Sequence, residues 1–144
     1  MDSDASMIGS VFLFKIKIIK YQSAIFSPVR DILDIPYYEL IKVEATVRIY
    51  INHVMFFSDD YFPILEFIYQ FEQWRKNPIV SKFEYNSIET DENPIVSFQI
   101  QNDNCIFDSV WKLTSEISSV KLPEVLNEIN DCKINLLKML NSGK

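Results

Sequence analysis

Two pairs of neighbouring carboxylates, Asp59-Asp60 and Asp91-Glu92, are the residues of this chain that come closest to a catalytic set. Paired carboxylates serve glycoside or phosphoryl chemistry when their environments drive the two pKa values apart. Simpler roles compete with this one. Asp59 and Asp60 precede an expected helix, whose free N–H groups they would cap. Asp91 and Glu92 fall with Glu89 between expected strands, where acids are solvated or contact a cationic partner.

The other side chains that could carry general-base, nucleophilic or metal chemistry are few and scattered. His53 is the only histidine, and it falls at an expected hairpin tip with no rigid neighbour to orient it. Cys105 and Cys132 form no CxxC motif, and together with His53 they lack the ligand spacing of a zinc site. Both cysteines are therefore expected to be buried thiols, and we expect no metal ion and no cofactor.

Glycine is almost absent from the chain, and this excludes several enzyme classes. The two glycines are Gly9 and Gly143, close to the two ends. Walker loops, dinucleotide fingerprints and nucleophile elbows all need glycine where the backbone approaches phosphate or takes strained dihedral angles. The sequence therefore predicts a protein without catalytic residues, and an enzyme with an unrecognised carboxylate site is the less favoured alternative.

Composition and charge indicate a packed domain with a basic partner. The 144 residues are 48% hydrophobic and 14% aromatic, enough for one domain over residues 1–144, of which 1–9 are expected to be flexible. The net charge of −6 repels phosphate backbones and anionic lipid, so neither nucleic acid nor membrane is an expected partner. Without a spanning apolar run or a secretory leader, we expect a soluble, cytoplasmic protein.

Strict alternation of apolar and polar residues predicts strands over residues 11–21 and 43–51. Asn52-His53 is typical of a hairpin turn, and residues 54–57 would return antiparallel to the second strand before Ser58-Asp59-Asp60 ends it. Residues 27–36 contain two prolines and several charges, so they form a connection with at most one helical turn.

Helical periodicity follows, with Pro63 in the first turn of a helix expected over residues 61–76. Its apolar stripe comprises Ile64, Phe67, Ile68, Phe71 and Trp74, and the opposite, polar face comprises Glu66, Gln70 and Gln73. Three strands are expected over 82–88, 94–101 and 105–113 as a meander. A last helix should run from near Pro123 to about 140. Its stripe comprises Leu122, Val125, Ile129, Cys132, Leu136 and Leu140.

The order strand, hairpin, helix, three-stranded meander, helix predicts an α+β fold. We expect one antiparallel sheet of about six strands, with both amphipathic helices packed on one face. The two tryptophans are candidate interface anchors, because aromatic side chains dominate binding energies. Trp74 continues the helix stripe and Trp111 shares an apolar strand face, so core packing is the favoured interpretation for both.

Several segments of the chain resemble a family of small bacterial proteins, the immunity proteins of polymorphic toxin systems. The resemblance is carried by residues 38–45, by residues 56–67 with Trp74, by residues 83–90 and by Ser109-Val110-Trp111, and it extends through the closing leucine-rich helix. It implies a cytoplasmic antidote that binds the C-terminal toxic domain of a contact-delivered or secreted toxin, often a nuclease.

Such a nuclease must present cationic surface to its substrate, so a carboxylate-rich partner could occupy that surface without any chemistry. A structural or adaptor subunit of a protein complex remains the alternative function. The candidate partner-binding residues are Asp59, Asp60, Glu84, Glu89, Asp91, Glu92 and Asp108.

Overall fold

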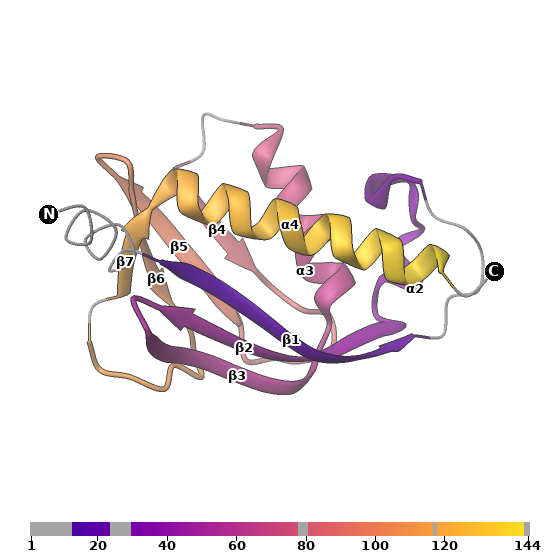
Figure 1. Cartoon of the computed structure of the whole chain (residues 1–144), viewed down its shortest axis with the longest axis horizontal. Coiled ribbons are helices and arrows are strands. Elements are labelled where there is room, and N and C mark those ends of the chain that lie inside the picture. Colours follow the sequence, from indigo (N-terminus) through magenta and orange to yellow (C-terminus); the bar gives the residue numbers. More distant parts are fainter. Residues whose placement is uncertain (1–12, 24–29, 78–80, 117, 143–144) are drawn as a thin grey trace, which may run out of the picture.

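The computed structural model of the chain describes residues 13–23, 30–77, 81–116 and 118–142 (Figure 1). The described residues form an α+β fold, as predicted, with seven strands and a long C-terminal helix. The strands make two antiparallel sheets of three and four strands, so the predicted single sheet of about six strands is wrong. The first nine residues, expected to be flexible, lie outside the described residues.

The first sheet has the order β1-β2-β3 and contains β1 (Phe14–Ser23), β2 (Val43–Ile51) and β3 (Val54–Phe62). Every second residue of β2 is buried, which confirms the predicted alternation. The β2–β3 hairpin turns through Asn52 and His53 at φ values of 51° and 73°, left-handed positions that asparagine tolerates better than most residues. The hairpin and its turn are therefore confirmed.

Strand β3 is longer than predicted and contains Asp59 and Asp60. The pairing with β2 continues across a bulge in this longer strand. Val47 pairs with Asp59 and Ala45 with Phe62, so β3 has one extra residue between these two pairs. The helix that follows begins after Pro63, which makes no side-chain capping bond. The predicted capping role of the two aspartates is therefore wrong. Both residues lie in strand β3 instead.

The second sheet has the order β4-β5-β6-β7. Its strands are β4 (Lys82–Tyr85), β5 (Val96–Gln101), β6 (Asn104–Asp108) and β7 (Ser118–Lys121). The first three form the predicted meander, turning through Asn102 and Asp103 at φ values of 51° and 71°. Strand β7 was not predicted, because four residues with two serines give no readable alternation.

The predicted strand over residues 105–113 ends early, at Asp108. The chain then leaves the second sheet and crosses to the first, where the Leu113 N–H donates to the Phe56 carbonyl at 2.9 Å. Residues 109–113, which we call the strap, thus contact the backbone of β3. Among the described strands, β3 pairs with β2 and β4 pairs with β5, so the two sheets remain separate.

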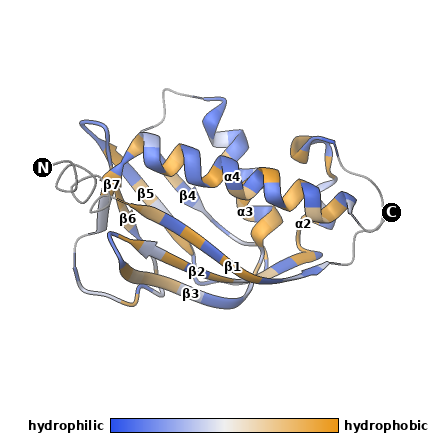
Figure 2. Ribbon diagram, viewed as in Figure 1, coloured by the Kyte–Doolittle hydropathy of each residue, from blue (hydrophilic) through white to orange (hydrophobic). Residues whose placement is uncertain are grey.

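Four helical segments accompany the strands in the described ranges. A 3-10 turn (Ile32–Asp34) and α2 (Tyr37–Leu40) lie in the connection after β1, and they precede α3 (Ile64–Arg75) and α4 (Leu122–Asn141). Figure 2 shows polar and apolar residues alternating around α4, and the predicted stripe of that helix is buried apart from half-buried Leu122. No helix in these ranges is long and apolar enough to cross a membrane.

Helix α3 joins the two sheets through aromatic contacts. The Phe67 ring lies 5.4 Å from that of Phe62 in β3 and 6.0 Å from that of Phe83 in β4. The sheets also meet directly, where the rings of Phe14 and Phe107 stack at 4.9 Å. One hydrophobic cluster therefore includes residues of both sheets, α3 and α4.

Truncation of the α3 stripe should destabilise the whole molecule. Phe71 is completely buried and contacts the rings of Trp74, Phe83 and Phe98. We expect Phe71→Ala to lower the free energy of unfolding in urea by about 3 to 5 kcal/mol, because a buried phenylalanine leaves a cavity. Exposed Asp91 provides the control, since Asp91→Lys should change it by under about 0.5 kcal/mol. Similar losses in both variants would contradict the assignment of the core.

Candidate partner-binding site

A buried carboxylate anchors the loop between β4 and β5. Glu66 of α3 is 0% exposed, so its predicted place on the polar face of the helix is wrong. Its carboxylate accepts hydrogen bonds from the Tyr85 hydroxyl at 2.8 Å, the Tyr37 hydroxyl at 3.1 Å and the Ile88 N–H at 3.3 Å. These donors compensate the loss of solvation that burial imposes on a carboxylate. Burial and the nearby Glu66 charge together raise the pKa of the Tyr85 hydroxyl, which keeps it a donor.

The loop of residues 86–94, which we call the acidic loop, has further fixed contacts. The Gln70 side chain of α3 holds the Asn86 backbone on both sides, accepting from its N–H at 3.1 Å and donating to its carbonyl at 2.7 Å. Within the loop, the Asn93 side chain accepts from the Ser87 N–H at 2.9 Å and donates to the Thr90 carbonyl at 2.8 Å. The acidic loop is therefore ordered by hydrogen bonds before any partner arrives.

Three carboxylates from separate segments form what we call the acidic cluster: Glu44 of β2, Asp59 of β3 and Glu89 of the acidic loop. Partial burial raises the pKa of each above its ordinary value, and the charges of neighbouring carboxylates add to this. Glu89 interacts with both Glu44 and Asp59, which shows that the three lie close together. The structure thus brings together two predicted residues, Asp59 and Glu89, with one that was missed, Glu44.

Asp60 adjoins the acidic cluster but is paired. Its carboxylate lies 3.2 Å from the Arg48 guanidinium of β2, and its charge also raises the pKa of Asp59. The Asp59 carboxylate accepts from the Tyr61 N–H at 2.9 Å, which fixes its position at the bulge. Arg48 also lies near enough to Asp59 to lower the pKa of that carboxyl, which opposes the larger effect of burial.

Glu92 connects the acidic loop to the strap. Its Oε1 accepts a hydrogen bond from the Trp111 indole N–H at 2.6 Å, and the Trp111 ring stacks over that of buried Phe57 at 6.4 Å. Trp111 is 36% exposed, so the expected core position is wrong. The reason is local. The Asp108 carboxylate accepts from the Ser109 N–H at 2.8 Å and turns the chain, so strand alternation ends before the tryptophan.

The remaining predicted residues lie elsewhere on the surface. Glu84 on β4 and Asp108 on β6 both pair in register with Ser97 of β5, so they share the outer face of the second sheet. Glu84 is also bridged to Lys82 at 3.2 Å. Asp91 is exposed in the acidic loop. The seven predicted carboxylates therefore do not form one site.

The two cysteines that were considered for metal chemistry are buried, as predicted. Burial raises the pKa of both Cys105 and Cys132 to about 12, so at neutral pH both are protonated thiols. In the described ranges, no three His, Cys, Asp or Glu side chains are grouped to hold a metal ion. Trp74 is half-buried against the core, as its place in the stripe predicted.

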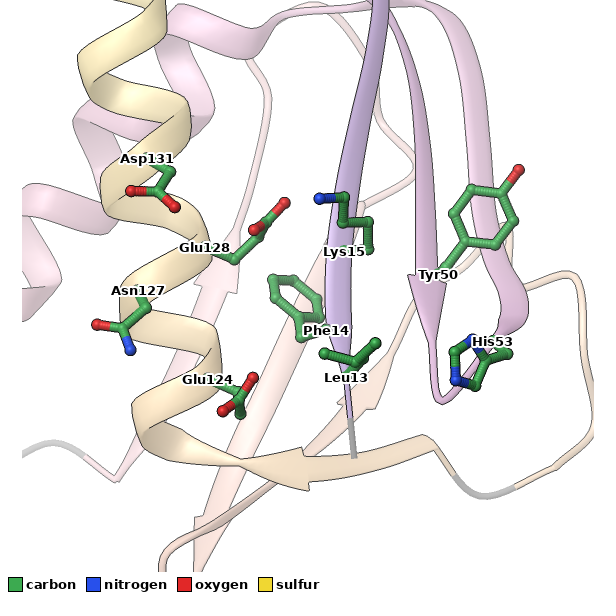
Figure 3. A pocket seen from close by; sticks show the side chains of 9 residues that line it. All are labelled: Leu13, Phe14, Lys15, Tyr50, His53, Glu124, Asn127, Glu128 and Asp131. Carbon is green, nitrogen blue, oxygen red and sulfur yellow. The ribbon is translucent and has the colours of Figure 1, made fainter. Parts of the chain in front are cut away.

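A groove of about 640 Å³ lies between β1 and α4, away from the acidic cluster. Figure 3 shows Glu124, Glu128 and Asp131 of α4 on one side, with Lys15 of β1 and His53 of the hairpin turn on the other. Glu128 has a structural role there, because its Oε2 accepts from the Ile16 N–H of β1 at 2.8 Å. This bond satisfies an edge-strand donor.

The chain belongs to a family described as a domain of unknown function, DUF7878, whose model matches residues 15–142. The match includes the seven strands apart from Phe14, the first residue of β1, together with both long helices and the acidic cluster. No curated protein and no solved structure matches the chain.

The Glu66 anchor can be tested with two tyrosine variants that each remove one hydroxyl. Tyr85→Phe leaves the buried carboxylate one donor short where water has no access, so we expect it to lower the free energy of unfolding in urea by about 1 to 3 kcal/mol. Tyr37→Phe is the matched control, because water can replace the hydroxyl of that more exposed residue. Equal, small losses would show that the carboxylate does not depend on its buried donor.

Partial burial of Glu89, together with repulsion from Glu44, Glu66 and Asp59, should make Glu89→Gln more stable than the wild type at pH 7. The raised pKa of Glu89 means that the folded chain binds this proton more tightly than the unfolded chain. The resulting stability is present below the ordinary pKa of 4.5 and is lost as the pH rises through the folded value. The glutamine is neutral at every pH and avoids that loss. We therefore expect the free energy of unfolding in urea at pH 7 to be higher in the variant by up to about 0.5 kcal/mol.

The difference between Glu89→Gln and the wild type should disappear toward pH 4, where both side chains are uncharged. Asp91→Asn removes a charge from the same loop outside the acidic cluster, and its effect should be smaller at every pH. A Glu89→Gln variant that is less stable than the wild type at pH 7 would mean that the three carboxylates do not repel.

Proposed function

We propose that this protein is an immunity protein that binds a cognate bacterial toxin domain and neutralises it by covering its active site or its access to target. The proposed toxin is a basic nuclease encoded beside the immunity protein, and the complex forms in the cytoplasm. The observation that carries the proposal is the acidic cluster, because its like charges are gathered on one surface by a loop that is already ordered.

The acidic cluster is better suited to an external cation than to an internal one. Among the described residues, the ion pairs join Asp60, Glu72 and Glu84 to basic side chains, but they do not include Glu44, Asp59 or Glu89. The Arg48 charge offsets part of the repulsion at Asp59, and the repulsion that remains among the three carboxylates raises the free energy of the isolated protein. A cationic partner would remove that repulsion on binding and would gain attraction at the same time.

Order in the acidic loop favours binding as well. Association is opposed by the entropy lost when side chains and loops are fixed at an interface. Here the contacts of Glu66 and Gln70 with the loop backbone fix Asn86 and Ile88 in advance. The entropy of ordering this loop is therefore lost on folding and not on binding. A larger part of the electrostatic attraction then contributes to affinity.

Inhibition by binding needs no catalytic group in the inhibitor. A nuclease surface that holds a phosphate backbone must be cationic, and a carboxylate cluster can occupy it in place of the substrate. Long-range attraction between such surfaces also accelerates association, by a factor that falls as salt is added. The resemblance to immunity proteins of polymorphic toxin systems supports the same function.

The proposal predicts one-to-one co-purification with the toxin domain encoded by the neighbouring gene, and a charge-dependent association rate. We expect the double variant Asp59→Lys/Glu89→Lys to lower the association rate constant at least about tenfold at low salt in surface plasmon resonance. The wild-type rate should fall steeply with added salt, and the variant rate should not.

The matched control is Asp131→Lys/Glu124→Lys, which makes the same change in net charge on α4. That helix contacts β1, which is at the opposite edge of the first sheet from β3. Equal effects of the two double variants would place the interface elsewhere. Absence of any complex with the neighbouring toxin domain would contradict the proposed function itself.

A further inference from the structure

Trp111 is held in a position that leaves part of its ring available to a partner. Its inner face stacks nearly parallel on buried Phe57, with 15° between the ring planes, so its exposed surface belongs to the outer face and the edge. The indole N–H is bonded to Glu92 Oε1, which places a carboxylate in line with the edge of the ring. The strap itself is fixed to β3 through the Leu113 N–H.

Apolar side chains flank the tryptophan on the strap. Val110 and Leu113 are 48% and 56% exposed, so both present apolar surface on the same segment as Trp111. A carboxylate, an aromatic face and aliphatic neighbours are thus assembled within one short segment and the loop bonded to it. An arginine side chain matches all three: its N–H groups suit the carboxylate, its guanidinium plane suits the aromatic face, and its methylene stem suits the aliphatic side chains.

We infer that Trp111 and Glu92 form an acceptor site for an arginine side chain of a cationic protein partner. The guanidinium plane lies over the outer face of the Trp111 ring, and one of its N–H groups donates to the Glu92 carboxylate. Val110 and Leu113 contact the methylene stem of the arginine. The inference deepens the proposed function and rests on it for the identity of the partner.

Arginine fits this site better than lysine because its charge is planar. A guanidinium stacks on an aromatic face and still directs N–H groups outward in its own plane toward a carboxylate. An ammonium is a compact, strongly hydrated charge that cannot do both as well. Glu92 Oε1 is already bonded to the indole, so Oε2 remains for the guanidinium. The acidic cluster attracts any cation, whereas this site discriminates between cations.

Two capped peptides of equal charge, tetra-arginine and tetra-lysine, provide probes that do not require the toxin. Titration is followed by the indole N–H resonances of the two tryptophans in ¹⁵N-labelled full-length protein, with Trp111→Phe used for assignment. We expect tetra-arginine to shift the Trp111 resonance and to bind about fivefold more tightly than tetra-lysine, in keeping with a cation–π contact at a partly exposed ring.

Three variants separate the arginine site from general attraction. Trp111→Leu should abolish the preference for arginine, and Glu92→Gln should reduce it, while Glu89→Gln should weaken both peptides about equally and keep the preference. Circular dichroism checks that each variant is folded. Equal affinity for the two peptides, or a preference that persists in Trp111→Leu, would overturn the inference.

The toxin complex distinguishes this inference from the proposed function. Trp111→Leu should raise the dissociation rate of the complex at high salt as well as at low salt, because stacking is screened less than charge attraction. A toxin that binds tightly without any dependence on Trp111 would overturn the arginine site and leave the immunity function standing. A protein that prefers arginine but binds no toxin would overturn the immunity function and leave the arginine site standing.

Discussion

The hydrogen-bonded Glu66 carboxylate is the interaction on which the rest of the surface depends. It connects α3 to Tyr37 of α2, to Tyr85 of β4 and to the backbone of Ile88 in the acidic loop. A carboxylate without partners would be expelled from such a position, because burial without compensation costs several kcal/mol. With its donors in place the buried carboxylate is stable, and moving any one of them away would leave it short of a hydrogen bond. The conformation of the loop is in this way linked to the stability of the core.

Hydrophobic periodicity predicted the elements that have one face in the core. The alternation of β2 and the stripe of α4 were both clear. At the hairpin turns, Asn52 and Asn102 occupy left-handed positions that glycine often fills, in a chain with only two glycines. Arrangement into two sheets could not be predicted in the same way. It depends on the strap, whose alternation predicted a continued strand although it crosses to β3, and on β7, whose four residues are too few for a periodic signal.

Residue type misled where a side chain has a tertiary partner. Glu66 was assigned to the solvent because glutamate is charged, but two tyrosines and an amide form a polar site for it inside the protein. Trp111 was assigned to the core because it shares an apolar face of the expected strand, but a turn at Asp108 and a bond to Glu92 place it at the surface. The first error arises from contacts between residues distant in sequence, and the second from a local turn together with one such contact.

The candidate site shows the same limit. Asp59 and Glu89 were chosen from the sequence for their charge, and the structure brings them together, whereas Glu84 and Asp108 lie on the second sheet. Glu44 was missed, since alternation along β2 reveals only that it faces outward. Knowing which outward-facing acids meet requires the pairing of β2 with β3 and the fold of the acidic loop over them.

Repulsion among these carboxylates and the rigidity of their support are two parts of one arrangement. A flexible loop would let Glu89 move away from Glu44 and Asp59, and the charge density would fall. The anchors at Glu66 and Gln70 prevent this, so the free protein retains an electrostatic strain that it cannot relax by itself. Glu92 extends the same loop to an aromatic ring held at the surface. In the complex that we propose, long-range attraction and short-range selectivity would be carried by one ordered segment, because a partner that satisfies the charges would also meet the ring.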